Sequence, residues 1–198
     1  MKTYFFKKSH YLGAHSSSIQ REAELFGKCL YRFICQSDKQ RPIICLCIGS
    51  VRSTGDSLGP LVGYKLEKYQ GQGFYIYGTL KQPVHALNLS ETIDTIKKKH
   101  PHALIIAVDA SLGQASHIGY VTLHSSPLRP GLGVNKSLPH VGDISITGIV
   151  NISGKYEHLL LQTTSLSLVM DIADFIALGV TKCLSLLESY QPAPMKSY

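Results

Sequence analysis

Acidic residues are scarce in this sequence. It has 13 Asp and Glu against 20 Lys and Arg in 198 residues, which gives a formal net charge of +7, and it contains no Trp. No apolar run approaches the length of about 18 residues that indicates a membrane-spanning helix. The basic start at residues 1–8 is not followed by the apolar stretch of a signal peptide. The sequence therefore predicts a cytoplasmic protein with no membrane partner.

The five cysteines lack the paired spacing of a zinc site or of a redox motif. Cys45 and Cys47 lie within the apolar run at residues 43–48, where a free cysteine behaves as a small buried hydrophobe. A reducing compartment fits this usage, because no pattern of bridging cysteines is present. We expect all five thiols to be reduced, with Cys45 and Cys47 buried.

Several catalytic motifs are also missing. The sequence has no glycine-rich dinucleotide fingerprint, no phosphate-binding loop of the Walker type, no serine nucleophile elbow and no paired-histidine zinc motif on a helix. These absences argue against an oxidoreductase, an NTPase and an ordinary serine hydrolase. The positive charge would suit an acidic or phosphate-bearing partner, but the Lys97–Lys99 run is interpreted as a solvated helix end. Nucleic acid is therefore not the expected partner.

Hydrophobic patterning predicts an α/β fold with a mostly parallel sheet. The runs at 43–48 and 104–108 are continuously apolar, which is typical of parallel strands covered on both faces. Further strands are expected at 74–77 and 144–152, and an edge strand at 118–123. Helices are expected at 19–34, 57–69, 87–99 and 165–188. The predicted organisation is a loose segment at 1–17, one domain at 18–190 and a polar tail at 191–198.

Two of the scarce acids follow the two most apolar strands. Asp56 lies in Gly-Asp-Ser-Leu-Gly-Pro (55–60), after the strand at 43–48, and Asp109 ends the strand at 104–108. Ligands bind at the carboxyl ends of parallel strands, so both acids are expected at one cleft. Two carboxylates facing one cleft repel each other, which separates their pKa values and provides an acid and a base. With His140 they would also form a divalent metal site.

Simpler roles remain open for each of these residues. Asp56 has the residue type preferred at a helix N-cap, although Ser57 would serve equally well there. Asp109 would equally cap a turn at Ala-Ser-Leu-Gly, and His140 would be an ordinary loop histidine. The sequence alone leaves these alternatives standing.

An ordered set of motifs resembles a known family. The segments at 48–60, 108–112, 130–136 and 142–151 resemble the sporulation proteins of spore-forming bacteria. That family is similar to the spore germination protease and, more distantly, to the hydrogenase maturation endopeptidases. The resemblance covers residues 40–190 and implies a phosphorylase/hydrolase-like fold, a three-layer α/β/α sandwich.

The resemblance also implies roles for individual residues. Asp56 and Asp109 match the proteolytic acid pair of the germination protease. In the maturation endopeptidases the corresponding acids and a loop histidine hold nickel, and His140 resembles that histidine. The chain is much shorter than the germination protease, so the zymogen and assembly of that enzyme are not carried over.

Together these observations predict an endopeptidase of sporulating cells that acts on a protein or peptide. One of Asp56 and Asp109 would activate water and the other would protonate the leaving amine. His140 would orient water or help to bind a divalent metal. The expected pocket residues are Gly49, Arg52, Gly55 and Ser57.

Two other functions compete with this prediction. The first is a non-catalytic binding or regulatory sporulation protein that retains the pocket. The second is RNA binding through the basic charge, because peptidyl-tRNA hydrolases have a broadly similar architecture. A homo-oligomer is compatible with the sequence.

Overall fold

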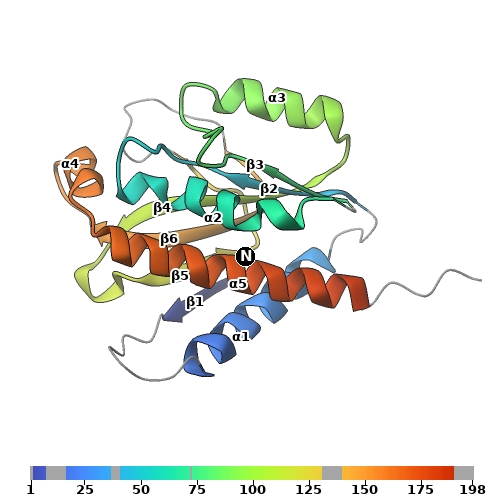
Figure 1. Cartoon of the computed structure of the whole chain (residues 1–198), viewed down its shortest axis with the longest axis horizontal. Coiled ribbons are helices and arrows are strands. Elements are labelled where there is room, and N and C mark those ends of the chain that lie inside the picture. Colours follow the sequence, from blue (N-terminus) through green and yellow to red (C-terminus); the bar gives the residue numbers. More distant parts are fainter. Residues whose placement is uncertain (1, 8–16, 37–40, 72, 131–139, 190–198) are drawn as a thin grey trace, which may run out of the picture.

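The computed structural model of the chain describes residues 2–7, 17–36, 41–71, 73–130 and 140–189. These residues form one six-stranded sheet with helices on both faces (Figure 1). The strands are β1 (Thr3–Lys7), β2 (Ile43–Cys47), β3 (Phe74–Tyr77), β4 (Leu104–Gly113), β5 (Tyr120–His124) and β6 (Ile144–Ile152). The α-helices are α1 (Ser17–Ile34), α2 (Leu58–Leu66), α3 (Leu89–Lys99), α4 (Glu157–Gln162) and α5 (Leu166–Ser189). Short 3₁₀ helices are η1 (Gly55–Ser57), η2 (Glu67–Tyr69) and η3 (Ala115–His117).

The sheet is mixed but mostly parallel, with the strand order β1-β5-β6-β4-β2-β3. β2 lies between β3 and β4 and is parallel to both, and β4 is also parallel to β6. The prediction that the strands at 43–48 and 104–108 are parallel neighbours in one sheet is confirmed. The predicted α/β class is confirmed with it.

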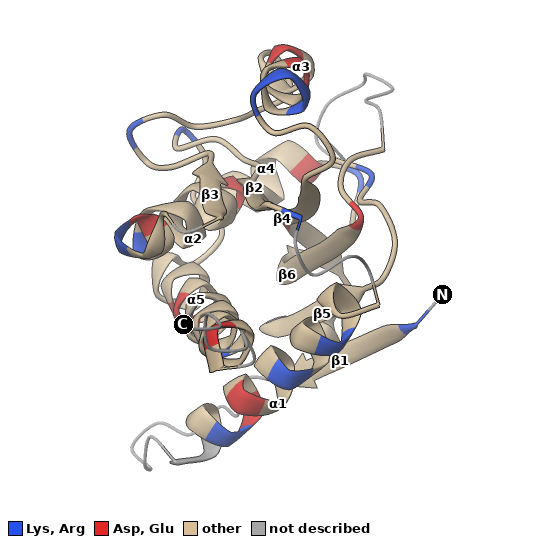
Figure 2. Cartoon of the chain, turned by 90° about the vertical axis from the view of Figure 1, so that its right-hand side faces the viewer, with Lys and Arg blue, Asp and Glu red and all other residues tan. Residues whose placement is uncertain are grey.

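Both faces of the central strands are covered, as their continuous apolar sequence predicts. All five residues of β2 are buried. Ile44 and Leu46 pack in the cluster under α3, whereas Cys45 and Cys47 pack in the larger cluster formed with α1, α2 and α5. Figure 2 shows this layering, with α3 on one side of the sheet and α2 and α5 on the other. The predicted burial of Cys45 and Cys47 is confirmed, and all five cysteines are free thiols.

The N-terminal end of the chain departs from the prediction of a loose segment at 1–17. Thr3–Lys7 form β1, which pairs antiparallel with β5. Tyr4 and Phe6 point inward, and the Phe6 ring lies 5.2 Å from that of Phe26 on α1. Phe5 on the opposite face is exposed. Inward and outward positions alternate along the strand, but Tyr4, Phe5 and Phe6 are all aromatic, so the sequence does not show the alternation. Residues 8–16 of the predicted segment, and the predicted tail at 191–198, lie outside the described residues.

β5 is likewise not the edge strand that its alternation suggested. It lies between β1 and β6, because β1 pairs along its outer side. An isolated alternating strand gives no information on whether another segment pairs with it. The edge prediction was wrong for the same reason that β1 was missed.

β4 is twice as long as the predicted strand at 104–108. It continues to Gly113, because Ala110–Gly113 pair with β6 through a register shift between Ser111 and Leu112. Asp109 therefore lies in the middle of β4 rather than at its end. At Asp109, however, β4 has already passed the end of β2, whose register stops at Cys47 opposite Val108.

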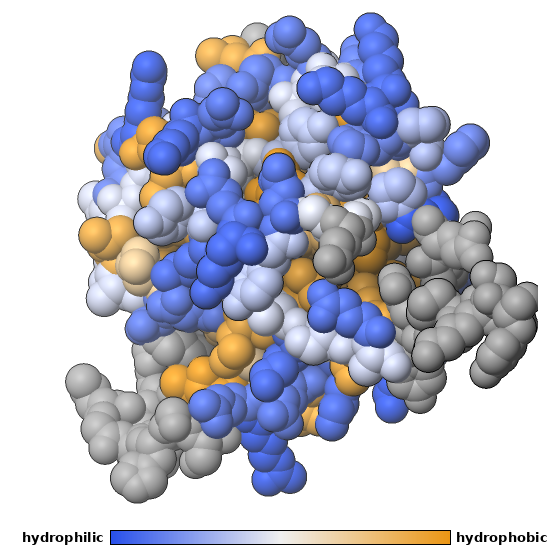
Figure 3. Space-filling model, turned by 45° about the vertical axis from the view of Figure 1, so that its right-hand side comes forward, coloured by the Kyte–Doolittle hydropathy of each residue, from blue (hydrophilic) through white to orange (hydrophobic). Residues whose placement is uncertain are grey.

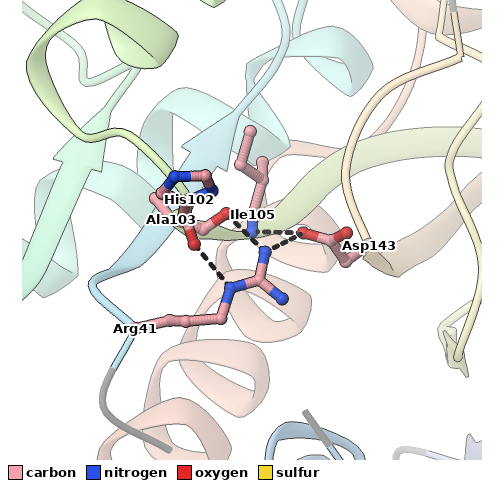
Figure 4. A network of polar contacts seen from close by, with 5 residues as sticks. All are labelled: Arg41, His102, Ala103, Ile105 and Asp143. Atoms are coloured by element: carbon pink, nitrogen blue, oxygen red, sulfur yellow. Dashed lines mark hydrogen bonds and ion pairs between the residues drawn. The ribbon is translucent and has the colours of Figure 1, made fainter. Parts of the chain in front are cut away.

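A polar network ties together the starts of the parallel strands (Figure 4). Arg41, just before β2, donates hydrogen bonds to the main-chain oxygens of His102 and Ala103, just before β4. Its guanidinium also lies 3.9 Å from Asp143, just before β6, and the Asp143 carboxylate accepts the Ile105 N–H at 2.9 Å. These contacts join the N-terminal ends of β2, β4 and β6 to one another.

On the side of the molecule that carries these strand starts, hydrophilic side chains cover most of the surface and apolar ones form scattered patches (Figure 3). The functional candidates lie at the opposite, carboxyl ends of the strands. Within the described residues, no helix combines the length and the apolar character needed to cross a bilayer.

Candidate functional site

A cavity of about 680 Å³ lies at the carboxyl ends of β2 and β4. Both candidate acids line it, Asp56 from η1 and Asp109 from β4. Its other walls come from the loop after β2, the loop between β3 and α3, and α4. The structure therefore brings Asp56 and Asp109 to one cavity, as the position of their strands predicted.

The loop after β2 folds back on itself to present Asp56. Gly49 has a φ of +147°, which favours glycine, and a Cβ at this position would collide with the main-chain oxygen of Asp56. The Ser50 N–H donates to that same oxygen at 3.1 Å. Gly59 plays a similar part at the start of α2, because a Cβ there would collide with the Ile48 carbonyl. The glycines of this motif are thus required by close backbone approach.

Asp109 reaches the cavity because β4 extends past β2. Its side chain is 7% exposed, and its Oδ1 accepts the N–H of the next residue, Ala110, at 2.8 Å. The Ile48 N–H donates to the Val108 oxygen at 2.7 Å, at the point where the ladder between the two strands finishes. The Asp109 carboxylate therefore lies beside the open end of this ladder. The alternative that it caps a turn is wrong, since Ala110–Gly113 are strand.

Two histidines accompany Asp56 in the cavity. His85 is placed by the β3–α3 loop, whose residue Val84 bridges to Ile48 and accepts the Gly49 N–H at 2.8 Å. His158 comes from α4. The Nδ1 of His85 is buried and has no hydrogen-bond partner among the described residues. An unsatisfied buried nitrogen at a cavity wall is a site where a ligand or water would gain a hydrogen bond.

The electrostatic setting of Asp56 combines opposing influences. Burial raises the pKa of the Asp56 carboxyl above its ordinary value. The Ser50 N–H and the positive charges of His85 and His158 act in the other direction and offset part of the rise in pKa. The net effect is a carboxyl that holds its proton to higher pH than a free aspartate, which is the property of a general acid.

The alternative of a simple N-cap is also wrong for Asp56. The residue before α2 is Ser57, and neither it nor Thr54, which precedes η1, makes a side-chain capping hydrogen bond. The Ser57 hydroxyl instead donates to the Thr54 carbonyl at 2.6 Å. Asp56 therefore has no helix-capping role to account for its presence here.

Of the four residues expected to line the pocket, Gly49 and Arg52 do so. Gly55 lies beneath α4 instead, because a Cβ there would be 2.9 Å from the Thr164 hydroxyl and 3.0 Å from Leu161. Ser57 is buried at the start of α2. Both residues support the cavity from outside its lining.

His140 does not join the acids. It is exposed, is absent from the cavity lining, and its Nε2 accepts a hydrogen bond from Arg129 at 2.9 Å. Within the described ranges, no group of three or more His, Cys, Asp and Glu side chains is placed to hold a metal. The set Asp56, Asp109 and His140 therefore does not fit the divalent metal that the family resemblance implies.

His85 and His158 are the site residues that sequence reasoning missed. A signal for His85 was available: it follows the strand at 74–77, so the rule that selected Asp56 and Asp109 applies to it as well. His158 had no comparable signal, because α4 is a single short helix of six residues after the last strand. Asn151 of β6 anchors this helix through a hydrogen bond to the Leu160 oxygen at 2.8 Å.

Comparison with known proteins assigns the chain to a family. "Uncharacterized protein YyaC" of Bacillus subtilis (strain 168) is 51% identical over 141 residues, which cover 71% of this chain and 69% of the relative. Among solved structures, the NiFe hydrogenase maturation protease HycI from Thermococcus kodakarensis KOD1 matches with a TM-score of 0.46 and 18% identity, over 77% of this chain and 99% of that one. A family model described as "Protein of unknown function (DUF1256)" matches residues 15–179, and the chain belongs to that family.

Proposed function

We propose that this protein is an endopeptidase in which Asp56 and Asp109 act together on a bound peptide. The observation that carries the proposal is the placement of two carboxylates in one cavity of about 680 Å³, the half-buried Asp56 from η1 and the buried Asp109 from β4. Residues 40–190 resemble the sporulation proteins, a family similar to the spore germination protease, and this resemblance supports a protein substrate and a role in sporulation. A cavity of this volume is within the range of ligand pockets, roughly 300–1,000 Å³.

The burial of Asp56 supports its assignment as the general acid, and Asp109 is then the base. The Asp109 carboxylate takes a proton from water as the water oxygen attacks the scissile carbonyl carbon. The tetrahedral intermediate collapses, the C–N bond breaks, and the proton of Asp56 passes to the leaving amine. Transfer of the proton from Asp109 to Asp56 through water restores the starting state.

Other residues of the cavity serve this reaction in the proposal. Arg52 lines the same cavity and supplies positive charge toward the oxyanion that develops on the carbonyl oxygen, and His158, which also lines it, would donate a hydrogen bond to that oxygen. His85 interacts electrostatically with Asp56 and stabilises its carboxylate once the proton has left. All steps use side chains of the chain itself, because the described residues do not assemble the metal ligand set.

The test is cleavage of small acid-soluble spore proteins and of a defined peptide mixture, followed by mass spectrometry. Asp56→Asn and Asp109→Asn should each lower kcat/KM by at least about 100-fold, the usual contribution of general acid–base catalysis. The double variant should lose little more, because the two groups act as one unit. Asp94→Asn, on the exposed face of α3, controls for the loss of one negative charge.

Two results would count against the proposal. Wild-type rates in both single variants would show that the acid pair does not catalyse the cleavage. Binding of peptides by the wild type without any cleavage would favour the alternative of a regulatory protein that uses the same cavity for recognition.

A further inference from the structure

The end of β4 has one paired edge and one open edge. Along β6 its pairing continues to Gly113, opposite Ile152. Along β2 its pairing stops at Val108, opposite Cys47. Within the described residues, no strand lies against Asp109–Gly113 on the β2 side. An unpaired strand edge is a row of main-chain donors and acceptors that another extended chain can pair with.

This open edge borders the cavity. Ala110, Ser111 and Leu112 all line it, next to Asp109. In parallel pairing, alternate residues direct both their N–H and C=O groups to the same neighbour, so Ala110 follows Val108 in the row that faces β2. The Ala110 N–H is satisfied by the Asp109 carboxylate rather than by β2. Asp109 thus occupies the position where the ladder would continue.

Apolar side chains surround the same opening. Leu87 is 83% exposed and Val51 is 49% exposed, and both line the cavity. Leu112 and Leu161 line it as well and are half-buried. Exposed large aliphatic side chains beside this acid-bearing cavity indicate contact with apolar groups of a ligand.

We propose that an extended segment of a protein substrate adds to the open edge of β4 as a further strand, with apolar side chains packed against Leu87 and Val51. The occupant is a strand rather than a small molecule, because main-chain groups at a strand edge are spaced to pair with another backbone. That the bound segment is a substrate rests on the proposed peptidase function, whereas the pairing itself does not.

Strand addition also has a consequence for the chemistry. A carbonyl of the bound segment would take over the Ala110 N–H, which the Asp109 Oδ1 now accepts. Loss of this hydrogen bond would make the Asp109 carboxylate a stronger base toward a water molecule beside the bound backbone. Substrate binding and activation of the base would be coupled through one N–H group.

The pairing is tested with fluorescein-labelled decapeptides that alternate apolar and polar residues, in a panel with Val, Leu or Phe at the apolar positions. Binding to the full chain carrying Asp56→Asn is followed by fluorescence anisotropy. Each peptide is made in three forms: unmodified, N-methylated at the apolar positions, and N-methylated at the polar positions. Only every second N–H of a strand faces its neighbour, so one methylated form should bind about tenfold more weakly, as expected for two lost hydrogen bonds. The other form should keep its affinity.

Side-chain variants provide an independent test of the pairing. Leu87→Ser should weaken binding of the unmodified peptide about tenfold through lost apolar contact, and Leu25→Ser, an exposed leucine on α1, should leave it unchanged. Equal effects of the two methylation patterns, unchanged binding by Leu87→Ser, or no binding of any unmodified peptide would overturn strand addition.

The same experiment separates the two proposals. Alternating sensitivity to methylation without cleavage by the wild type would support strand addition and contradict the peptidase function. If instead the wild type cleaves the peptides and both methylated forms bind equally well, the result would support the peptidase function and contradict strand addition.

Discussion

Asp56 is held in a position where its ionised form is costly. Burial raises its pKa, so between the ordinary carboxyl pKa and the raised value the folded protein binds more protons than the unfolded chain. In that window the free energy of unfolding falls as pH rises, because stability increases with pH only where the unfolded state binds more protons. Above this window the ionised carboxylate lowers the free energy of unfolding, so an acidic residue at this buried position carries a structural cost.

We accordingly expect Asp56→Asn to be more stable than the wild type above this window. The difference in the free energy of unfolding should shrink as the pH is lowered through the raised pKa and vanish below the ordinary carboxyl pKa of about 3.9. Urea unfolding of both proteins from pH 3 to pH 8 measures it. The exposed Asp94→Asn serves as the control, and a variant that is less stable than the wild type at pH 8 would contradict the expectation.

Gly49 is the residue whose backbone makes the loop after β2 possible. Gly49→Ala combines a φ of +147° with a collision between the new Cβ and the Asp56 carbonyl. We expect a loss of about 3 kcal/mol, from backbone strain and overpacking together, and a fall in peptide cleavage as Asp56 shifts. Gly71→Ala is the matched control: its φ is +132°, but a Cβ there meets nothing within 4 Å, so a loss of about 1 kcal/mol is expected. Chemical denaturation of both variants measures the difference.

Among the elements, those with a strong period were predictable from sequence. The strands at 74–77 and 144–152 were predicted with the bounds that β3 and β6 have, and the helix at 19–34 differs from α1 by two residues at its start. Each of these segments buries one or both of its faces, so its apolar residues recur at a regular spacing. That spacing is enough to predict the type of the element and its bounds.

The elements that were missed depend on partners far away in the sequence. β1 is a strand because β5 pairs with it, and β4 continues past Val108 because β6 extends alongside it. Neither pairing leaves a local signal. The same holds for the site: Asp56 and Asp109 were found from the strands they follow, whereas His158 is brought to the cavity only by the packing of α4 on η1 and β6.

The contact between α1 and α5 depends on two glycines. A Cβ on Gly179 of α5 would collide with the Phe26 ring of α1, and a Cβ on Gly27 would lie 2.7 Å from the Gly179 carbonyl. Ala is favoured over Gly in a helix by about 1 kcal/mol, but forcing extra volume into a packed interface costs about 1–3 kcal/mol. The collision is with a ring that has no exposed surface, so the packing cost should prevail.

We therefore expect Gly179→Ala to lower the free energy of unfolding by about 1–2 kcal/mol. Adding Phe26→Leu should return part of that loss, because the two positions share one space. Gly154→Ala, at an exposed loop position where the nearest side-chain atom is 3.3 Å away, is the control. A gain in stability for Gly179→Ala would show that α1 moves aside without cost.

In the whole molecule, the strands that form the cavity are different from the strands that extend the sheet over α1. The cavity is assembled at β2 and β4 from the loop after β2, the β3–α3 loop, the end of β4 and α4. β1 and β5 lie on the other side of β6, where they extend the sheet over α1. Phe6 on β1 is buried and its ring makes edge-on contact with Phe26, while Phe5 beside it is exposed.

This separation predicts that stability can be lowered without changing the site. Phe6→Ala removes a buried ring and should cost about 3 kcal/mol, or roughly 10 °C in Tm for a chain of this size. Peptide cleavage or binding, measured well below the Tm and per folded molecule, should stay at the wild-type level, since β5 and β6 stand between β1 and β4. Phe5→Ala should change neither quantity. A loss of cleavage by Phe6→Ala at full folding would show instead that the antiparallel end of the sheet holds the acid pair in place, and that the position of β6 transmits changes at β1 to Asp109.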